Sequence, residues 1–337
     1  MTRPALDPRA WGCWLASLAL VTLWVRNPLY LAIVLLVSQL LAARPAADKQ
    51  MPALRLWRLG AVMLLFSGVF NLAFVHNGVG VLWRLPASWP LIGGAWTWEA
   101  AVAGLINGLT LWTLLVAFVA FNQAVDPDEL VRLGPRALHD VGVVVLIALT
   151  YVPQTLQQWQ RIREAQAIRG HRLRGWRDWR PLLLPLLVGG LERALALAES
   201  LVARGYGRSA ESDASTLQRL ALFGGLLLAL AGWVAALWWG WPGWLLLALG
   251  FGLLVGVTWG MGRQTPVSRF RPKPWHRHST LLILLALIPL LVVTLGRADI
   301  SYNPYPRLAW PPFQPWLGLA LLLFAAPLTL ELSSAAA

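Results

Sequence analysis

Long apolar runs, repeated along the whole chain, constrain the fold of this protein more than any other feature of its sequence. Of its 337 residues 58% are hydrophobic and only 13% are charged, which is too apolar for an ordinary soluble domain. A helix needs roughly 20 residues to cross a hydrocarbon core of about 30 Å. We therefore predict an all-α polytopic membrane protein with about eight transmembrane helices, at residues 11–25, 28–43, 60–76, 98–121, 217–239, 242–261, 279–296 and 315–331.

Positive charge is concentrated in a few short connections and indicates how the helices are oriented. The formal net charge is +13, and all of the 28 basic residues except Lys49 and Lys273 are Arg. Most of them lie in the connections 44–58, 157–180 and 263–278, whereas the alternating connections are rich in Trp, Pro and Gly. By the positive-inside rule we expect the basic connections and both termini to be cytoplasmic, in a multi-pass protein of the inner or plasma membrane. Basic residues that cluster in short loops beside apolar runs reflect membrane topology and argue against nucleic-acid binding, so membrane lipid and not nucleic acid is the expected partner.

One further apolar run, Val141 to Leu156, does not fit this alternation as a crossing helix. If it crossed, the Arg-rich segment 157–180 would face outside. We expect a helix that lies under the inner leaflet or partly in it, and the sequence leaves open whether this helix enters the bilayer. The chain then divides into residues 1–121 with four spans, a cytoplasmic helical insertion at 122–216, spans five and six at 217–262, and an extension with two further spans at 263–337.

Two helix ends inside the insertion share one pattern. Residues 165–170 read Ala-Gln-Ala-Ile-Arg-Gly, and residues 203–205 read Ala-Arg-Gly. Each places an Arg directly before a Gly, the residue that most readily takes the left-handed conformation closing a helix. Capping explains either end alone, because the helix dipole favours a cation at the C-terminus. The alternative is that both Arg side chains are presented to a partner protein at rigid helix ends.

An amphipathic helix is expected to lead into the second of these ends, from about Pro181 to Arg204. Its residues divide into an apolar face that recurs every three or four positions and a polar face opposite. The apolar face holds Leu184, Leu187, Leu191, Leu195, Ala198 and Val202, and the polar face holds Glu192, Arg193, Glu199, Ser200 and Arg204. We expect the first face to contact protein or lipid and the second to face a hydrated partner.

Motifs for catalysis are missing from the chain. With only two lysines it has no Gly-rich phosphate-binding loop, and no pair of its five His residues has the spacing of a metalloprotease site. His276 and His278 flank an Arg in a basic loop and are interpreted as solvated. We therefore expect no enzyme activity, no cofactor and no metal site.

Two other classes of membrane protein are the alternatives. A self-contained permease would place ionisable residues within the spans, and the proposed spans contain almost none. An integral-membrane lipid enzyme would need clustered acids and histidines at the interface. The candidate pairs for such a cluster are Asp178 with His171 and Asp140 with His139.

Several short motifs occur in the order typical of one family of membrane proteins. They are Leu6-Asp7-Pro8-Arg9-Ala10-Trp11, Arg26-Asn27-Pro28-Leu29, Tyr151-Val152-Pro153, Ala165-Gln166 with Arg169-Gly170, and Ala203-Arg204-Gly205. Over roughly residues 5–262, the chain resembles the transmembrane T component of energy-coupling factor (ECF) transporters, the EcfT/CbiQ family.

The resemblance implies a non-catalytic scaffold of an ECF-type ABC importer. In that family the T component links two cytoplasmic ATPase subunits to a small membrane S component, which captures a vitamin or an ion such as cobalt or nickel and alone determines the substrate. The resemblance also implies that two coupling helices dock on the ATPases through their Arg-Gly ends. Carried over to this sequence, the docking residues are Ala165, Gln166, Arg169, Gly170, Ala203, Arg204 and Gly205.

Two features depart from the family pattern. The first helix end has Ile168 where the family has Ala directly before the Arg. After Gly262 the chain continues through a basic loop and two spans that the usual T component lacks, which is too short for an S component of about six helices. Extra membrane packing and a site for an added partner are the two interpretations of this extension.

Overall fold

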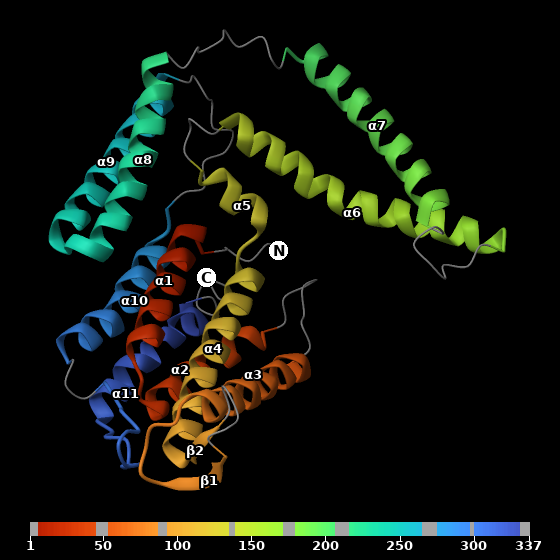
Figure 1. Cartoon of the computed structure of the whole chain (residues 1–337). Helices are drawn as coiled ribbons and strands as arrows, with labels where there is room; N and C mark the ends of the chain where they lie inside the picture. The colour runs from red at the N-terminus through yellow and green to blue at the C-terminus, as the bar shows by residue number, and fades with distance from the viewer. Residues whose placement is uncertain are drawn as a thin grey trace. The chain divides into compact units, whose positions relative to one another are not determined.

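Helices make up most of the computed structural model (Figure 1). The structure describes residues 6–44, 53–86, 93–134, 139–170, 179–205, 216–264, 275–296 and 300–330. The chain forms two compact units: one combines Met1–Glu129 with Pro272–Ala337, and the other is Leu130–Arg271. Of the four predicted segments, the first (1–121) and most of the last (263–337) therefore belong to a single unit.

The first unit is built from helices of the N-terminal and C-terminal parts of the chain. They are α1 (Pro8–Trp24), α2 (Pro28–Ala42), α3 (Ala53–Phe74), α4 (Trp98–Ala124), α10 (Arg277–Leu295), α11 (Pro315–Leu322) and the 3-10 helix η3 (Leu323–Ala325). Asp7 Oδ1 accepts the N–H of Arg9 at 2.9 Å, and Asn27 Oδ1 accepts the N–H of Leu29 at 3.0 Å. A Pro follows each cap at the first helical position, where its missing N–H leaves no bond unmade. The Asp-Pro motif therefore sets where α1 begins, and the Asn-Pro motif sets where α2 begins.

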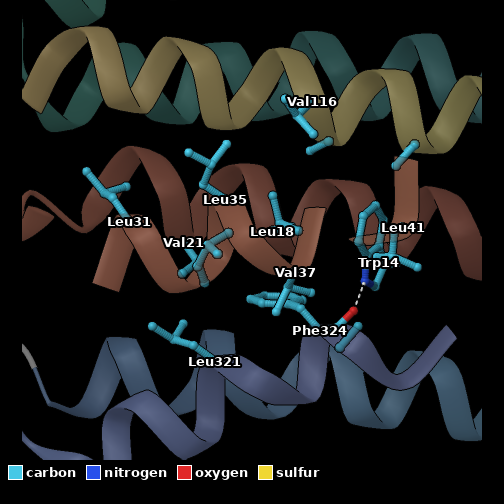
Figure 2. Packing of buried hydrophobic residues seen from close by; sticks show 14 of the residues in the cluster. Trp14, Leu18, Val21, Leu31, Leu35, Val37, Leu41, Val116, Leu321 and Phe324 are labelled. Carbon is cyan, nitrogen blue, oxygen red and sulfur yellow. Dashed lines mark hydrogen bonds between the residues drawn. The ribbon is translucent and has the colours of Figure 1, made fainter. Parts of the chain in front are cut away.

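The core of the first unit includes the C-terminal extension. Side chains from α1, α2, α4, α11 and η3 meet in one apolar cluster (Figure 2). Polar bonds join the same elements: Trp14 Nε1 donates to the carbonyl of Phe324 at 3.0 Å, and the Ser17 hydroxyl donates to that of Ala286 at 2.5 Å. The backbone N–H of Gln314 donates to the Tyr30 hydroxyl at 2.7 Å. The described helices α10 and α11 therefore support the first of the two interpretations of residues 263–337, which is extra membrane packing.

A short β-hairpin departs from the predicted all-helical fold. Strands β1 (Val81–Leu85) and β2 (Gly94–Thr97) pair antiparallel between α3 and α4, in a connection that the sequence predicted only as a Trp-rich loop. The carboxylate of Glu99, 3% exposed, accepts the N–H of Gly80 at 2.9 Å and fixes the approach to β1. The two strands have only five and four residues, and neither alternates apolar with polar side chains, so the pattern gave no strand signal.

The second unit contains two helical pairs. The first is α6 (His139–Ile168) with α7 (Arg180–Ala203), and the second is α8 (Thr216–Trp239) with α9 (Trp241–Gln264). The short α5 (Pro127–Arg132) lies where the two units join along the chain. Gly240, with a φ of +64°, makes the tight turn between α8 and α9, which pack closely along their small residues (Figure 1).

The number of membrane-spanning candidates differs from the eight that the sequence predicted. Within the described ranges, seven helices are long and apolar enough to cross: Leu56–Phe74, Trp98–Ala124, Val141–Ile168, Arg180–Ala203, Leu220–Trp239, Trp241–Met261 and Arg277–Leu295. Three predicted spans are instead the shorter helices α1, α2 and Pro315–Leu330, the last of which ends beyond η3. Helix α1 has 17 residues and α2 has 15, and each has one side buried in the core and large apolar side chains exposed on the other. The protein is thus a multi-pass membrane protein.

Candidate functional site

Helices α6 and α7 carry the two predicted Arg-Gly ends. α6 is one continuous helix of 30 residues that includes Pro153, and α7 has 24 residues. The expected helical run from Val141 into the polar stretch that follows Leu156 is therefore present. α7 starts at Arg180 and stops at Ala203, within one residue of the predicted limits at each end.

The two helices end with the same backbone geometry. At the first end, the N–H of Gly170 donates to the carbonyl of Ala167 at 3.0 Å; at the second, the N–H of Gly205 donates to that of Val202 at 2.9 Å. The φ angles of the two glycines are +80° and +81°. A Cβ at either glycine would meet nothing within 4 Å, so backbone conformation and not crowding calls for Gly. The left-handed helix ends predicted from the sequence are confirmed at both positions.

Both ends are presented outward. The side chains of Arg169 and Arg204 are exposed, as are Ala165, Ala203 and both glycines, and Ile168 is 88% exposed. Gln166 differs, because it is half-buried. The seven predicted residues therefore form two separate groups, each with a guanidinium held at a rigid, accessible helix end.

A seam between α6 and α7 brings together residues that the sequence did not single out. The Tyr151 hydroxyl donates to the carbonyl of Arg193 at 3.5 Å, and the amide of Gln158 fills the space beside Gly189, where an added Cβ would lie 2.6 Å from Gln158 Nε2. The rings of Trp159 and Trp179 pack at a centroid separation of 5.5 Å. The signal that could have located the seam is the Gly189-Gly190 pair, since two glycines inside a helix are unfavourable unless packing requires them.

The predicted division of α7 into two faces is partly wrong. All six residues of its predicted apolar face are exposed, as are Glu192, Glu199 and Ser200. Arg193, however, was expected on the hydrated side and is half-buried in the seam against α6. The polar-face assignment failed because a helical wheel gives the direction of a side chain but not the position of the neighbouring helix. Among the described residues, none covers the apolar face of α7.

No alternative chemistry gains support from the described part of the chain. There, no group of three or more His, Cys, Asp or Glu residues could hold a metal ion. Of the pairs considered for a lipid enzyme, His171 and Asp178 lie outside the described residues, and His139 and Asp140 form the first turn of α6. The outward-facing Arg-Gly ends are the strongest candidate site.

The chain is similar to known transport proteins. A family model described as CbiQ, cobalt transport protein, matches residues 3–216, which include both helix ends but stop short of the predicted limit at residue 262. The energy-coupling factor transporter transmembrane protein EcfT of Streptococcus thermophilus is 26% identical over 221 residues, covering 60% of this chain and 79% of its own. For EcfT of Bacillus selenitireducens the identity is 26% over 216 residues, with coverage of 60% and 78%. EcfT of Lacticaseibacillus paracasei is 30% identical over 158 residues, with coverage of 43% and 58%.

Proposed function

The chain belongs to the CbiQ family, and from that premise we propose that it transmits ATP-driven motion from two cytoplasmic ATPase subunits to a small substrate-binding S component. It is an EcfT-type transmembrane component of an energy-coupling factor transporter and is not itself an enzyme. The cargo is a vitamin or a transition-metal ion, and the S component selects it.

The observation that carries this proposal is the identical, exposed termination of α6 and α7. An Arg guanidinium donates bidentate, charge-assisted hydrogen bonds to a carboxylate, each worth about 1.5–3 kcal/mol when water is excluded. Arg169 and Arg204 are the donors in this proposal, and acidic residues on the two ATPases are the acceptors. Gly170 and Gly205 end each helix directly after the Arg, so that the guanidinium lies at an exposed helix end from which it can enter a groove.

Helices of this length can act as levers between the ATPases and the membrane. When ATP binding closes the ATPase pair, the two docked ends move relative to each other, and the apolar faces of α6 and α7 move with them. The exposed stripe Leu184, Leu187, Leu191 and Leu195 on α7 offers a surface for the S component. No catalytic residue of this chain is needed for such a motion.

The expected orientation places both termini and residues 122–216 on the cytoplasmic side. α6 and α7 are each long enough to cross the bilayer, but a double crossing would put their Arg-rich connection outside. A single cysteine at Arg172, in the connection that lies outside the described residues, tests the orientation in a Cys13→Ser background. A membrane-impermeant maleimide is expected to label it in inverted vesicles but not in sealed cells. Labelling in sealed cells would place the connection outside.

The docking assignment predicts that charge reversal breaks the complex. In a co-purification of the tagged chain with its ATPases, Arg169→Glu and Arg204→Glu are each expected to reduce the recovered ATPase at least tenfold. The lost hydrogen bonds and the new repulsion from the acidic groove both weaken ATPase binding. Arg163→Glu is the matched control, because Arg163 is an exposed Arg on α6 less than two turns before Arg169.

The control separates docking from general loss of positive charge. Arg163→Glu is expected to retain ATPase at the wild-type level, and all three variants should reach the membrane in equal amounts. Full ATPase recovery with both docking variants would show that the Arg residues only cap their helices. Equal loss with all three variants would indicate a diffuse electrostatic attraction without specific docking.

A further inference from the structure

Three connections between helices of the first unit meet at one end of that unit. The turn between α1 and α2 is tied to the α10–α11 connection, because Asn27 Nδ2 donates to the carbonyl of Pro312 at 2.6 Å. The α10–α11 connection is tied in turn to the one between α3 and α4, because the N–H of Val79 donates to the carbonyl of Pro306 at 3.3 Å. The three connections therefore form one continuous surface at the same end of the helices (Figure 1).

The β-hairpin is held firmly at the base of this surface. The buried carboxylate of Glu99 accepts the N–H of Gly80 at 2.9 Å, and the N–H of Trp98 donates to the carbonyl of Gly80 at 2.9 Å. The Thr97 hydroxyl donates to the carbonyl of Asn77 at 2.7 Å. These bonds join the segment before β1 to the start of α4, so the hairpin is a preformed part of the surface.

Each of the three connections presents an exposed Arg within three residues of an exposed Trp. The pairs are Arg26 with Trp24, Arg84 with Trp83, and Arg307 with Trp310. In the described part of the chain no carboxylate forms an ion pair with any of these three guanidinium groups, so their charges are available to an external anion. The positive-inside rule disfavours basic residues on the side where this surface is expected, so topology does not explain them.

The surface lies where helices leave the membrane. α3, α4 and α10 are each long and apolar enough to cross a bilayer, and the connections start at their ends, at Phe74, Trp98 and Leu295. The surroundings at that depth are phospholipid headgroups, whose phosphates are negatively charged. Trp is enriched at this level because its ring is apolar and its N–H is polar. The planar guanidinium of Arg donates two parallel hydrogen bonds to a phosphate.

We propose that the three Trp–Arg pairs form a binding surface for anionic phospholipid headgroups, built jointly by the α1–α2 turn, the β-hairpin and the α10–α11 connection. The Trp rings lie at the level of the glycerol and upper acyl groups, and the guanidinium groups donate to lipid phosphates. The surface fixes the depth of the first unit in the bilayer. It gives the C-terminal extension a role in addition to completing the core, and it does not depend on ATPase docking.

A fluorophore on the surface reports both its depth and its lipid preference. Leu308 is 45% exposed and lies between Arg307 and Trp310. The full-length chain with Cys13→Ser and Leu308→Cys is labelled with a nitrobenzoxadiazole fluorophore and reconstituted in phosphatidylcholine vesicles. Nitroxide-labelled phosphatidylglycerol, at the same mole fraction as nitroxide-labelled phosphatidylcholine, is expected to quench about fivefold more efficiently. Aqueous iodide should quench weakly.

Removal of the three guanidinium groups is expected to abolish this lipid preference. With Arg26→Gln, Arg84→Gln and Arg307→Gln combined, the two nitroxide lipids should quench equally. The corresponding triple Lys variant keeps the charge and should retain most of the preference, which separates binding of phosphate from a change in the fold.

Three exposed arginines of the second unit provide the matched control. Arg132→Gln, Arg161→Gln and Arg163→Gln together remove the same charge and are expected to leave the quenching ratio unchanged. Equal quenching by the two lipids before any Arg is replaced would overturn the proposal, as would loss of the preference in the control. Strong quenching by iodide and none by either lipid would also overturn it, because the surface would then face water and be open to a soluble partner protein.

Discussion

Removal of residues 265–337 is expected to prevent the protein from accumulating in the membrane as a folded, monodisperse species. The described part of this segment, α10, α11 and η3, forms one side of the core in which Trp14 and Leu18 are fully buried. Truncation would expose those side chains and leave Trp14 Nε1 and the Ser17 hydroxyl without the carbonyls that accept from them. Size-exclusion chromatography of a fluorescently tagged chain, with and without the segment, measures the outcome.

A pair of point variants examines the same contact without truncation. Trp14 is 0% exposed, whereas Trp24 on the same helix is 52% exposed. Trp14→Ala is expected to destabilise the fold by about 3–5 kcal/mol through lost packing and an internal cavity, while Trp24→Ala should have a much smaller effect. Thermal stability in detergent compares the two. Wild-type behaviour of both Trp14→Ala and the truncated chain would mean that the extension is dispensable, and the packing shown in Figure 2 would then not be required for folding.

Gly250→Leu is expected to disrupt the α8–α9 hairpin. A Cβ at Gly250 would clash with the backbone nitrogen of Ala229, and backbone cannot move aside as a flexible side chain can. The two helices would have to separate, with loss of the close contacts that hold small-residue interfaces together in lipid. We expect a loss of several kcal/mol, seen as a large fall in the amount of folded protein, by analogy with overpacked cores in which backbone shifts cost about 1–3 kcal/mol or more.

Gly252 is the matched control for this substitution, two residues further along the same helix. A Cβ there meets nothing within 4 Å and points to an exposed surface. Gly252→Leu adds the same side chain and the same helix propensity, so it should leave the yield unchanged or raise it. Equal yields for the two variants would show that α8 and α9 do not depend on close backbone contact.

The helix ends could be predicted from sequence because their determinants are local. A glycine that follows an Arg at the end of a periodic run acts within four residues, and the φ angles of Gly170 and Gly205 agree with that prediction. The caps at Asp7 and Asn27 are local in the same sense. Their docking role came from a resemblance to known proteins and remains a proposal, since no property of a helix end by itself identifies its partner.

Non-local features were the ones that the sequence left open or assigned wrongly. For residues 263–337 the sequence left two interpretations, extra membrane packing and a partner site, and the described part packs against α1 and α2 through bonds that span 310 and 285 residues of sequence. Arg193 looked hydrated because its own helix is amphipathic, yet α6 covers it. In each case the deciding neighbour is far away along the chain.

By itself the sequence determined that this protein is a helical membrane protein, where most of its helices begin and end, and that α6 and α7 each finish in an exposed Arg followed by a left-handed Gly. These properties follow from apolar run length and from backbone conformation, which act over a few residues. Only the tertiary structure decided that the extension completes the first core and that Gln158, Gly189 and Arg193 meet in one seam. The physical reason is that packing and the pairing of buried polar atoms depend on which helices lie side by side, and apolar surfaces suited to lipid and to protein look alike in sequence.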